Sequence, residues 1–299
     1  MKLAVVSTAR QEPCDFATFS ARQSRWLAEA ADRGAELTLL PDGLACELRG
    51  DGGAEAAGDP HRHAAELQRL RASWLQLYRQ LAITHAMAIV AGAFPVADGG
   101  GRHALRSDLL LPDGTHHWQD RLHLSAAETG SGLYRPGCSL NVLQVGGTTV
   151  GIAAGPDAAY PLPVHAQCQA GATLLLMPAH VHDGRNAVET RIAAQARALE
   201  NGCVVAQSLL LDHGCASAAS WQGGYADATV IDPGDPGTWL PRPGPRAAAQ
   251  SQWQIINIDL DAASAQGANA QRARNWASQY FPSVRQPRRL GPLRSMLAA

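Results

Sequence analysis

The chain has 299 residues, of which 46% are hydrophobic and 17% charged, and its formal net charge is -1. This length can bury one large core, and the balanced charge excludes the strong positive field that attracts nucleic acid or an anionic membrane. No apolar run approaches the roughly 20 residues of a membrane-spanning helix. The six cysteines form no Cys-x-x-Cys pair and no secretion signal is visible, so we expect reduced thiols and a cytoplasmic protein.

The first part of the chain predicts strands that alternate with helices. Leu3–Ser7 and Leu37–Leu40 are short apolar runs, and Phe16–Arg33 between them has a helical pattern. This is a βαβ unit, which is typical of a sheet with parallel neighbours. Ala64–Ile83 places its apolar residues at a helical period, and Ala86–Gly92 has the length and composition of a buried strand.

The rest of the chain continues the alternation. Further strands are predicted at Leu105–Leu111, Leu140–Val145, Thr148–Ala154, Leu174–Met177, Val204–Leu210, Asp227–Ile231 and Gln254–Ile258. Helices are predicted at Asn186–Asn201 and Ala265–Tyr280, and loops at Gly50–Gly58 and Asp232–Pro245. Gly146-Gly147 predicts a hairpin turn, Pro178 the end of a strand and Gly202 a helix C-cap. We expect an α/β fold in which residues 1–285 form one domain and residues 286–299 a C-terminal tail.

The segment from Val150 to Pro161 is the most informative part of the chain. An apolar strand passes into a turn and then a helix, which is where an α/β enzyme commonly presents its nucleophile. Here the turn contains Gly155 and Pro156, neither of which carries a reactive side chain. We expect Asp157 to cap the helix that begins near Tyr160.

Several segments, in this order, resemble the nitrilase (carbon–nitrogen hydrolase) superfamily. They are Gly34–Asp42, Pro112-Asp113-Gly114, Arg121-Leu122-His123-Leu124 with Glu128, Gly155-Pro156-Asp157 with Tyr160-Pro161-Leu162, Arg197-Ala198-Leu199-Glu200-Asn201, and Tyr225–Pro233. The resemblance spans roughly residues 2–285, and the probability that both order and spacing agree by chance is small. It implies a four-layer α-β-β-α sandwich, and a homodimer packed helix layer against helix layer.

The resemblance also implies a site in which three positions have changed. The family uses a cysteine nucleophile, a glutamate base and a lysine, and these positions hold Gly155, Asp42 and Arg121. A supporting glutamate of the family matches Glu128. Glycine cannot form an acyl-enzyme, and Pro156 lacks the backbone N–H that helps to hold the oxyanion. The missing cysteine side chain is expected to leave extra room beside Asp42 and Arg121.

Three hypotheses follow. The first is a protein that has lost cysteine-dependent hydrolysis and keeps a pocket for a small amide, carboxylate or amine. The second is an active amide hydrolase in which Asp42 or Glu128 activates a water, with a metal ion at His180 and His182 as a further option. The third is a non-catalytic subunit of an oligomer. In each case Asp42, Arg121 and Glu128 can instead form a structural ion cluster.

The remaining candidates are weaker. Pro156, Tyr160, His180 and His182 are candidate ligand-binding residues because they lie near the expected pocket. The two histidines have the spacing of metal ligands but no third ligand is evident, so no metal or cofactor is expected. Four more histidines are interpreted as loop or helix-start residues: His61, His63, His116 and His117.

Overall fold

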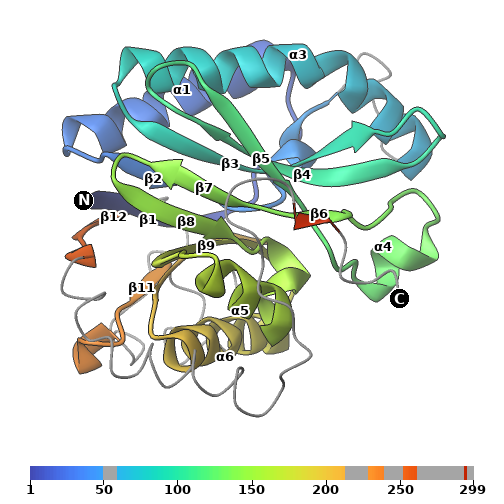
Figure 1. Ribbon diagram of the computed structural model, residues 1–299. Helices are drawn as coiled ribbons and strands as arrows, with labels where there is room; N and C mark the ends of the chain where they lie inside the picture. The colour runs from blue at the N-terminus through green and yellow to red at the C-terminus, as the bar shows by residue number, and fades with distance from the viewer. Residues whose placement is uncertain (50–58, 213–227, 239–251, 261–292, 295–299) are drawn as a thin grey trace.

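The computed structural model describes residues 1–49, 59–212, 228–238, 252–260 and 293–294, and it has a mixed α/β fold built on a large sheet (Figure 1). The strands are β1 (Lys2–Ala9), β2 (Leu37–Leu39), β3 (Ala88–Ala97), β4 (His103–Leu110), β5 (His116–Asp120), β6 (Ser139–Leu140), β7 (Val142–Val145), β8 (Thr148–Ile152), β9 (Leu174–Val181), β10 (Val204–Leu211), β11 (Thr229–Ile231), β12 (Gln252–Asn257) and β13 (Leu293–Arg294). The α-helices are α1 (Phe16–Asp32), α3 (Pro60–Thr84), α4 (Ala126–Gly130), α5 (Pro161–Gln169) and α6 (Gly184–Asn201). Short 3₁₀ helices are η1 (Leu44–Glu47), η2 (Gly155–Ala159) and η3 (Pro236–Thr238).

The strand order confirms the predicted parallel neighbours. The main sheet follows the order β5-β4-β3-β2-β1-β10-β9-β8-β7, with β11 beside β10 and β12 beside β1. β1 is parallel to β2 and to β10, and β10 is parallel to β9. β7 and β8 form the predicted hairpin around Gly146, and α6 ends at Gly202 in the left-handed conformation. The carboxyl ends of β1, β2, β9 and β10 therefore share one edge, where α/β sheets bind ligands.

Three of the four apolar clusters among the described residues join the helices to the sheet or one half of the sheet to the other. The first packs α1 and α3 against the sheet through large side chains such as Phe19, Trp74 and Tyr78. The second lies between the two halves of the sheet and joins residues of β1–β4 to residues of β7–β10. The third packs α5 and α6 against β9 and β10. Figure 1 shows α1 and α3 on one side of the sheet and α5 and α6 on the other. The pairing of β1 with β10 joins the half of the sheet formed by β1–β5 to the half formed by β7–β10. The four-layer arrangement stays a prediction.

Two details of the predicted strands were wrong. β9 does not stop at Pro178 but continues to Val181. β8 pairs with β9 only as far as Leu176, so the missing N–H of Pro178 can face the side of β9 without a partner. His116 and His117 lie in β5 and not in a loop, because β5 pairs with β4 along its whole length despite its polar sequence.

A buried ion pair fixes α3 on this part of the sheet. Arg71 donates two hydrogen bonds to Asp108, at 2.5 and 2.7 Å, and His116 Nε2 lies 2.9 Å from the same carboxylate. Asp108 is fully buried. Burial opposes its ionisation, but the hydrogen bonds from Arg71 and His116 outweigh this effect and hold the pKa of Asp108 below its usual value.

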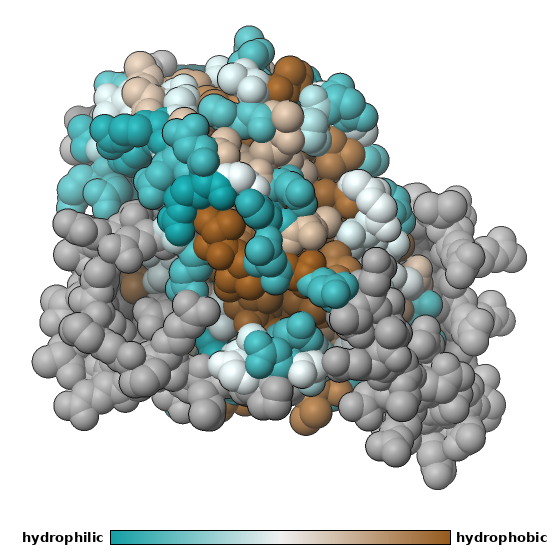
Figure 2. All heavy atoms as spheres, turned by 90° about the vertical axis from the view of Figure 1, so that its left-hand side faces the viewer, coloured by the Kyte–Doolittle hydropathy of each residue, from teal (hydrophilic) through white to brown (hydrophobic). Residues whose placement is uncertain are grey.

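The surface and the terminal segments of the described residues give little further information about the site. No helix among the described residues is long and apolar enough to cross a membrane. The face shown in Figure 2 has an apolar centre with hydrophilic residues above and below it. The predicted helix Ala265–Tyr280 and the loop Gly50–Gly58 lie outside the described residues. Within the predicted tail, β13 pairs with β6.

Candidate functional site

Asp42 follows β2 and is held in place by backbone hydrogen bonds. Its Oδ1 accepts N–H groups from Gly43 at 2.9 Å and from Ala93 at 3.0 Å, and the residue is 3% exposed. Ala93 comes from β3, which passes close to the Asp42 turn. A Cβ atom at Gly92 would lie 2.0 Å from the carbonyl oxygen of Pro41, so only glycine allows this approach. The close packing of β3 against the turn therefore fixes the direction of the Asp42 carboxylate.

Arg121 joins the two carboxylates predicted for the site. It directly follows β5, is buried, and donates from Nη2 to Asp42 Oδ2 and from Nη1 to Glu128 Oε1. Glu128 is positioned by the capping box of α4, in which its Oε2 accepts the N–H of Ser125 at 2.7 Å. Burial opposes the charge of Arg121, but Asp42, Glu128 and Asp157 together outweigh this effect and raise its pKa. The predicted residues thus form one ion cluster, in which Asp42 and Arg121 are buried and Glu128 is partly exposed.

Gly155 lies against the guanidinium of Arg121. It begins η2 with a φ of +55°, a conformation that favours glycine. A Cβ atom at this position would lie 3.0 Å from Arg121 Nη2, 3.1 Å from its Cζ and 3.3 Å from its Nε. A side chain at position 155 would therefore extend into the space that the guanidinium occupies. The reason is the planar, broad head of arginine, which reaches further than the compact ammonium of lysine.

Asp157 has a different role from the one predicted. It does not cap α5, because its carboxylate turns toward the segment after β5 and accepts the N–H groups of Leu122, at 2.9 Å, and His123, at 2.7 Å. His123 Nδ1 lies 3.0 Å from the same carboxylate. The His123 ring stacks on Tyr160, with ring centroids 3.8 Å apart, and Tyr160 is 47% exposed. Asp157 therefore fixes the backbone that carries Arg121.

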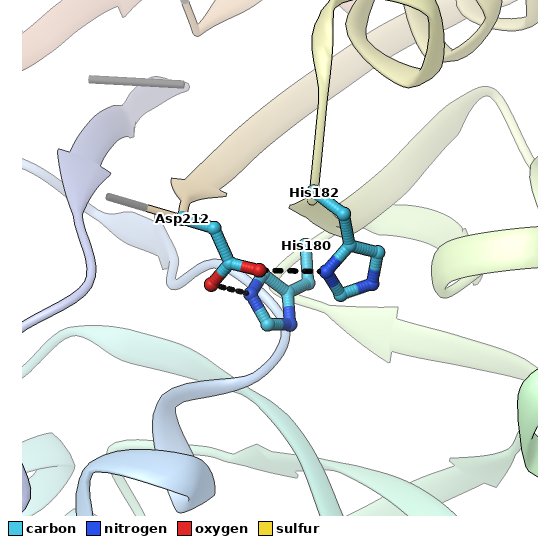
Figure 3. A group of neighbouring side chains, drawn as sticks. All are labelled: His180, His182 and Asp212. Carbon is cyan, nitrogen blue, oxygen red and sulfur yellow. Dashed lines mark hydrogen bonds and ion pairs between the residues drawn. The ribbon is translucent and has the colours of Figure 1, made fainter. Parts of the chain in front are cut away.

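A second polar cluster lies at the carboxyl ends of β9 and β10 (Figure 3). His180 Nε2 is 2.9 Å from Asp212 Oδ1, and His182 Nδ1 is 2.8 Å from Asp212 Oδ2. The His180 ring also packs against Gly43, since a Cβ there would lie 2.7 Å from His180 Nδ1. Burial lowers the pKa of His180. The cluster thus adjoins the turn that carries Asp42.

Two residues near the ion cluster were not predicted. Cys46 lies in η1 and Tyr134 in the segment after α4. Cys46 reaches the surface, but the protein packed around its thiol and then the charge of Asp42 raise its pKa to about 11. Burial, followed by the charges of Cys46 and Glu128, raises the pKa of Tyr134 to about 12. Cys46 comes only four residues after Asp42, and this closeness in sequence could have placed it near the site. The sequence around Tyr134 gives no such signal.

Comparison with protein families gives one match that covers most of the chain. Residues 2–213 match the family model described as carbon-nitrogen hydrolase. A protein of Mycobacterium tuberculosis strain H37Rv, named Hydrolase Rv0480c, is 27% identical over 249 residues, which cover 79% of this chain and 82% of that protein. Hydrolase MT0498 of strain CDC 1551 gives the same values.

Solved structures show the same fold. A carbon-nitrogen hydrolase from Helicobacter pylori G27 aligns with a TM-score of 0.73 and 12% identity, over 95% of this chain and 97% of that one. An amidase from Nesterenkonia sp. AN1, described as a member of the nitrilase superfamily, aligns in one form with a TM-score of 0.67 and 22% identity, over 92% of this chain and 97% of that one. A further form of that amidase carries acrylamide added at an active-site cysteine, with a TM-score of 0.64 and 21% identity, over 92% of this chain and 99% of that one. At these identities the likeness concerns the fold.

Proposed function

This chain belongs to the carbon–nitrogen hydrolase family, and we propose that it binds a small polar ligand at the Arg121 site without cysteine-dependent hydrolysis of an amide or nitrile. The contact between Gly155 and the guanidinium of Arg121 is the observation that carries this proposal. A thiol nucleophile must reach both its substrate and its base. Here the position that the family gives to the cysteine has no side chain, and arginine takes the adjoining space. Pro156 also offers no N–H to an oxyanion.

The state of the two carboxylates supports the same conclusion. Asp42 accepts two backbone N–H groups and one bond from Arg121, and Glu128 accepts one of each kind. Each of the four carboxylate oxygens thus already accepts a hydrogen bond from the protein. A general base must also be within reach of the proton that it removes. These contacts disfavour the alternative in which Asp42 or Glu128 activates a water.

The ligand class follows from a hydrogen-bond donor that has no acceptor. Nε of Arg121 is buried and has no partner among the described residues, and it lies beside Gly155. Buried donors in native proteins are normally paired, and leaving one unpaired costs about 1–3 kcal/mol. An amide or carboxylate oxygen would accept this N–H. We therefore infer that the ligand is a small amide or carboxylate, and that Arg121 recognises its oxygen.

Two measurements on the purified protein test the proposal. A panel of amides, carbamoyl compounds and nitriles is expected to give no turnover above buffer, and small amides or carboxylates are expected to raise the melting temperature in a saturable manner. Arg121→Lys removes the Nε donor and is expected to weaken this binding about tenfold or more. Turnover at an ordinary enzyme rate of about 1 s⁻¹ or faster would overturn the loss of hydrolysis. A panel without any saturable ligand would overturn the binding role and favour a non-catalytic subunit.

We also propose that two copies pair through α5 and α6. Four of the six large apolar side chains that are exposed among the described residues lie on or next to these helices: Tyr160, Leu162, Ile192 and Leu199. Ile192 and Leu199 are seven residues apart on α6, so they share one face of the helix. Ile192→Glu with Leu199→Glu is expected to convert a dimer to a monomer in light scattering. Ile83→Glu, on α3, is the matched control, and an unchanged mass in both variants would refute the interface.

A further inference from the structure

The cluster formed by His180, His182 and Asp212 has the composition of a transition-metal site. His180 lies near the end of β9 and His182 directly follows the strand; their rings lie side by side, with centroids 4.3 Å apart. In the parallel pairing of β9 with β10, Leu210 lies opposite His180 and Leu211 opposite Val181. Asp212 follows directly and reaches both rings. The register of two strands thus brings three potential ligands together from positions 30 residues apart.

The distances suit a metal ion after a small movement. One ligand atom from each of the three residues lies within 4.8 Å of the others. Tetrahedral zinc with bonds of about 2.0–2.2 Å to nitrogen and oxygen needs ligand atoms about 3.4 Å apart. The side chains of His182 and Asp212 are 64% and 23% exposed, so they can rotate by about 1 Å without disturbing the core. Figure 3 shows the carboxylate of Asp212 joined to both rings, with one oxygen facing each ring.

The exposed His182–Asp212 pair contributes little to stability, typically about 0–1 kcal/mol. Asp212 is also paired with Arg10, whose Nη1 lies 3.1 Å from Oδ1. Arg10 follows β1, and its charge balances the carboxylate when no cation is bound. The site therefore contains two imidazoles, one carboxylate and the neighbouring guanidinium of Arg10. A bound divalent ion would displace Arg10 from Asp212 or shift it to the outer side of the carboxylate.

We propose that His180, His182 and Asp212 bind one divalent transition-metal ion, of which zinc is the best match to two imidazoles and a carboxylate. Three protein ligands leave a coordination position open, as in zinc sites that hold water or a substrate oxygen. The cluster adjoins the Asp42 turn, because His180 packs against Gly43. This metal site does not depend on the function proposed for the Arg121 cluster.

The site is tested by binding of the metal alone to the full-length protein after removal of metals with a chelator. Calorimetric titration with zinc chloride is expected to give one ion per chain. His182→Gln and Asp212→Asn are each expected to weaken binding at least tenfold, while Arg10→Gln is expected to keep or tighten it because a competing positive charge is lost. His61→Gln, at an exposed histidine of α3, is the matched control. Cobalt is expected to give visible absorption bands in the wild type that are lost in His182→Gln.

The variants also separate folding from binding. His182 is largely exposed, so His182→Gln is expected to melt at the same temperature as the wild type when a chelator is present. The proposal is overturned if the wild type shows no saturable one-to-one binding of zinc or cobalt. It is equally overturned if His182→Gln and Asp212→Asn bind as tightly as His61→Gln, because the ion would then be held elsewhere.

Discussion

We predict that replacing Gly155 by cysteine gives no working thiol site in this fold, and the structure gives the size of the obstacle. Gly155 has a φ of +55°, and a side chain there would begin 3.0 Å from Arg121 Nη2. A residue other than glycine in the left-handed region costs about 1–2 kcal/mol. The same side chain would also push the guanidinium away from its two carboxylates. We expect Gly155→Cys to lower the melting temperature by about 2–8 °C and to hydrolyse no amide.

A double-mutant cycle separates backbone strain from the contact with Arg121. Gly155→Ala adds the same Cβ without a thiol and is the matched control for stability. If the guanidinium is the obstacle, the cost of Gly155→Ala in urea unfolding falls by about 0.5–3 kcal/mol in an Arg121→Lys background. The strain from φ remains in both backgrounds. Additive costs, a neutral Gly155→Ala, or amide hydrolysis by Gly155→Cys alone would each refute the reasoning.

Three further predictions concern Arg121, Asp108 and Cys46. Arg121→Met leaves two carboxylates without their cation and is expected to cost about 3–5 kcal/mol in urea unfolding; a cost below 1 kcal/mol would contradict a tightly held cluster. The stabilisation from Asp108 is present above its unfolded pKa of 3.8 and is lost as the pH falls through its lower folded pKa. Asp108→Asn is therefore expected to be less stable than the wild type at pH 7, with the difference shrinking below pH 3.8; a difference independent of pH would contradict this. Cys46, with a pKa of about 11, is expected to react slowly with iodoacetamide at pH 7 and much faster at pH 10, as followed by mass spectrometry against Cys138; rapid alkylation at pH 7 would contradict the raised pKa.

Much of the fold could be predicted because it depends on local apolar patterns. The βαβ opening and the β7–β8 hairpin follow from the spacing of apolar residues and from glycines at turns. The turn Pro112-Asp113-Gly114 indicated a hairpin after β4, but β5 itself was not assigned because its sequence is polar; its pairing with β4 and the ion pair at Asp108 define it as a strand. The continuation of β9 past Pro178 depends on where β8 ends, which no local pattern encodes.

The candidate site divides in the same way. The resemblance placed Asp42, Arg121 and Glu128 in one site, and the structure brings them into contact. Asp212 could not be paired with His180 from sequence, because their contact depends on the register of β9 against β10. The position of the Arg121 guanidinium could not be predicted from the sequence either. The length of the arginine side chain does not determine the direction in which it points.

Arg121 and Gly155 are coupled by geometry. A Cβ atom at position 155 would lie 3.0–3.3 Å from the guanidinium, so one of the two groups would have to shift by a few tenths of an ångström. Aspartate has a shorter stem than glutamate, and the longer arm of Arg121 spans the added distance to Asp42 while a second nitrogen reaches Glu128. Under the proposed function, the glycine, the aspartate and the arginine thus fit together as one packing arrangement, in which Arg121 contacts Asp42, Glu128 and Gly155. We therefore expect a cysteine at position 155 to need a smaller side chain at position 121 as well.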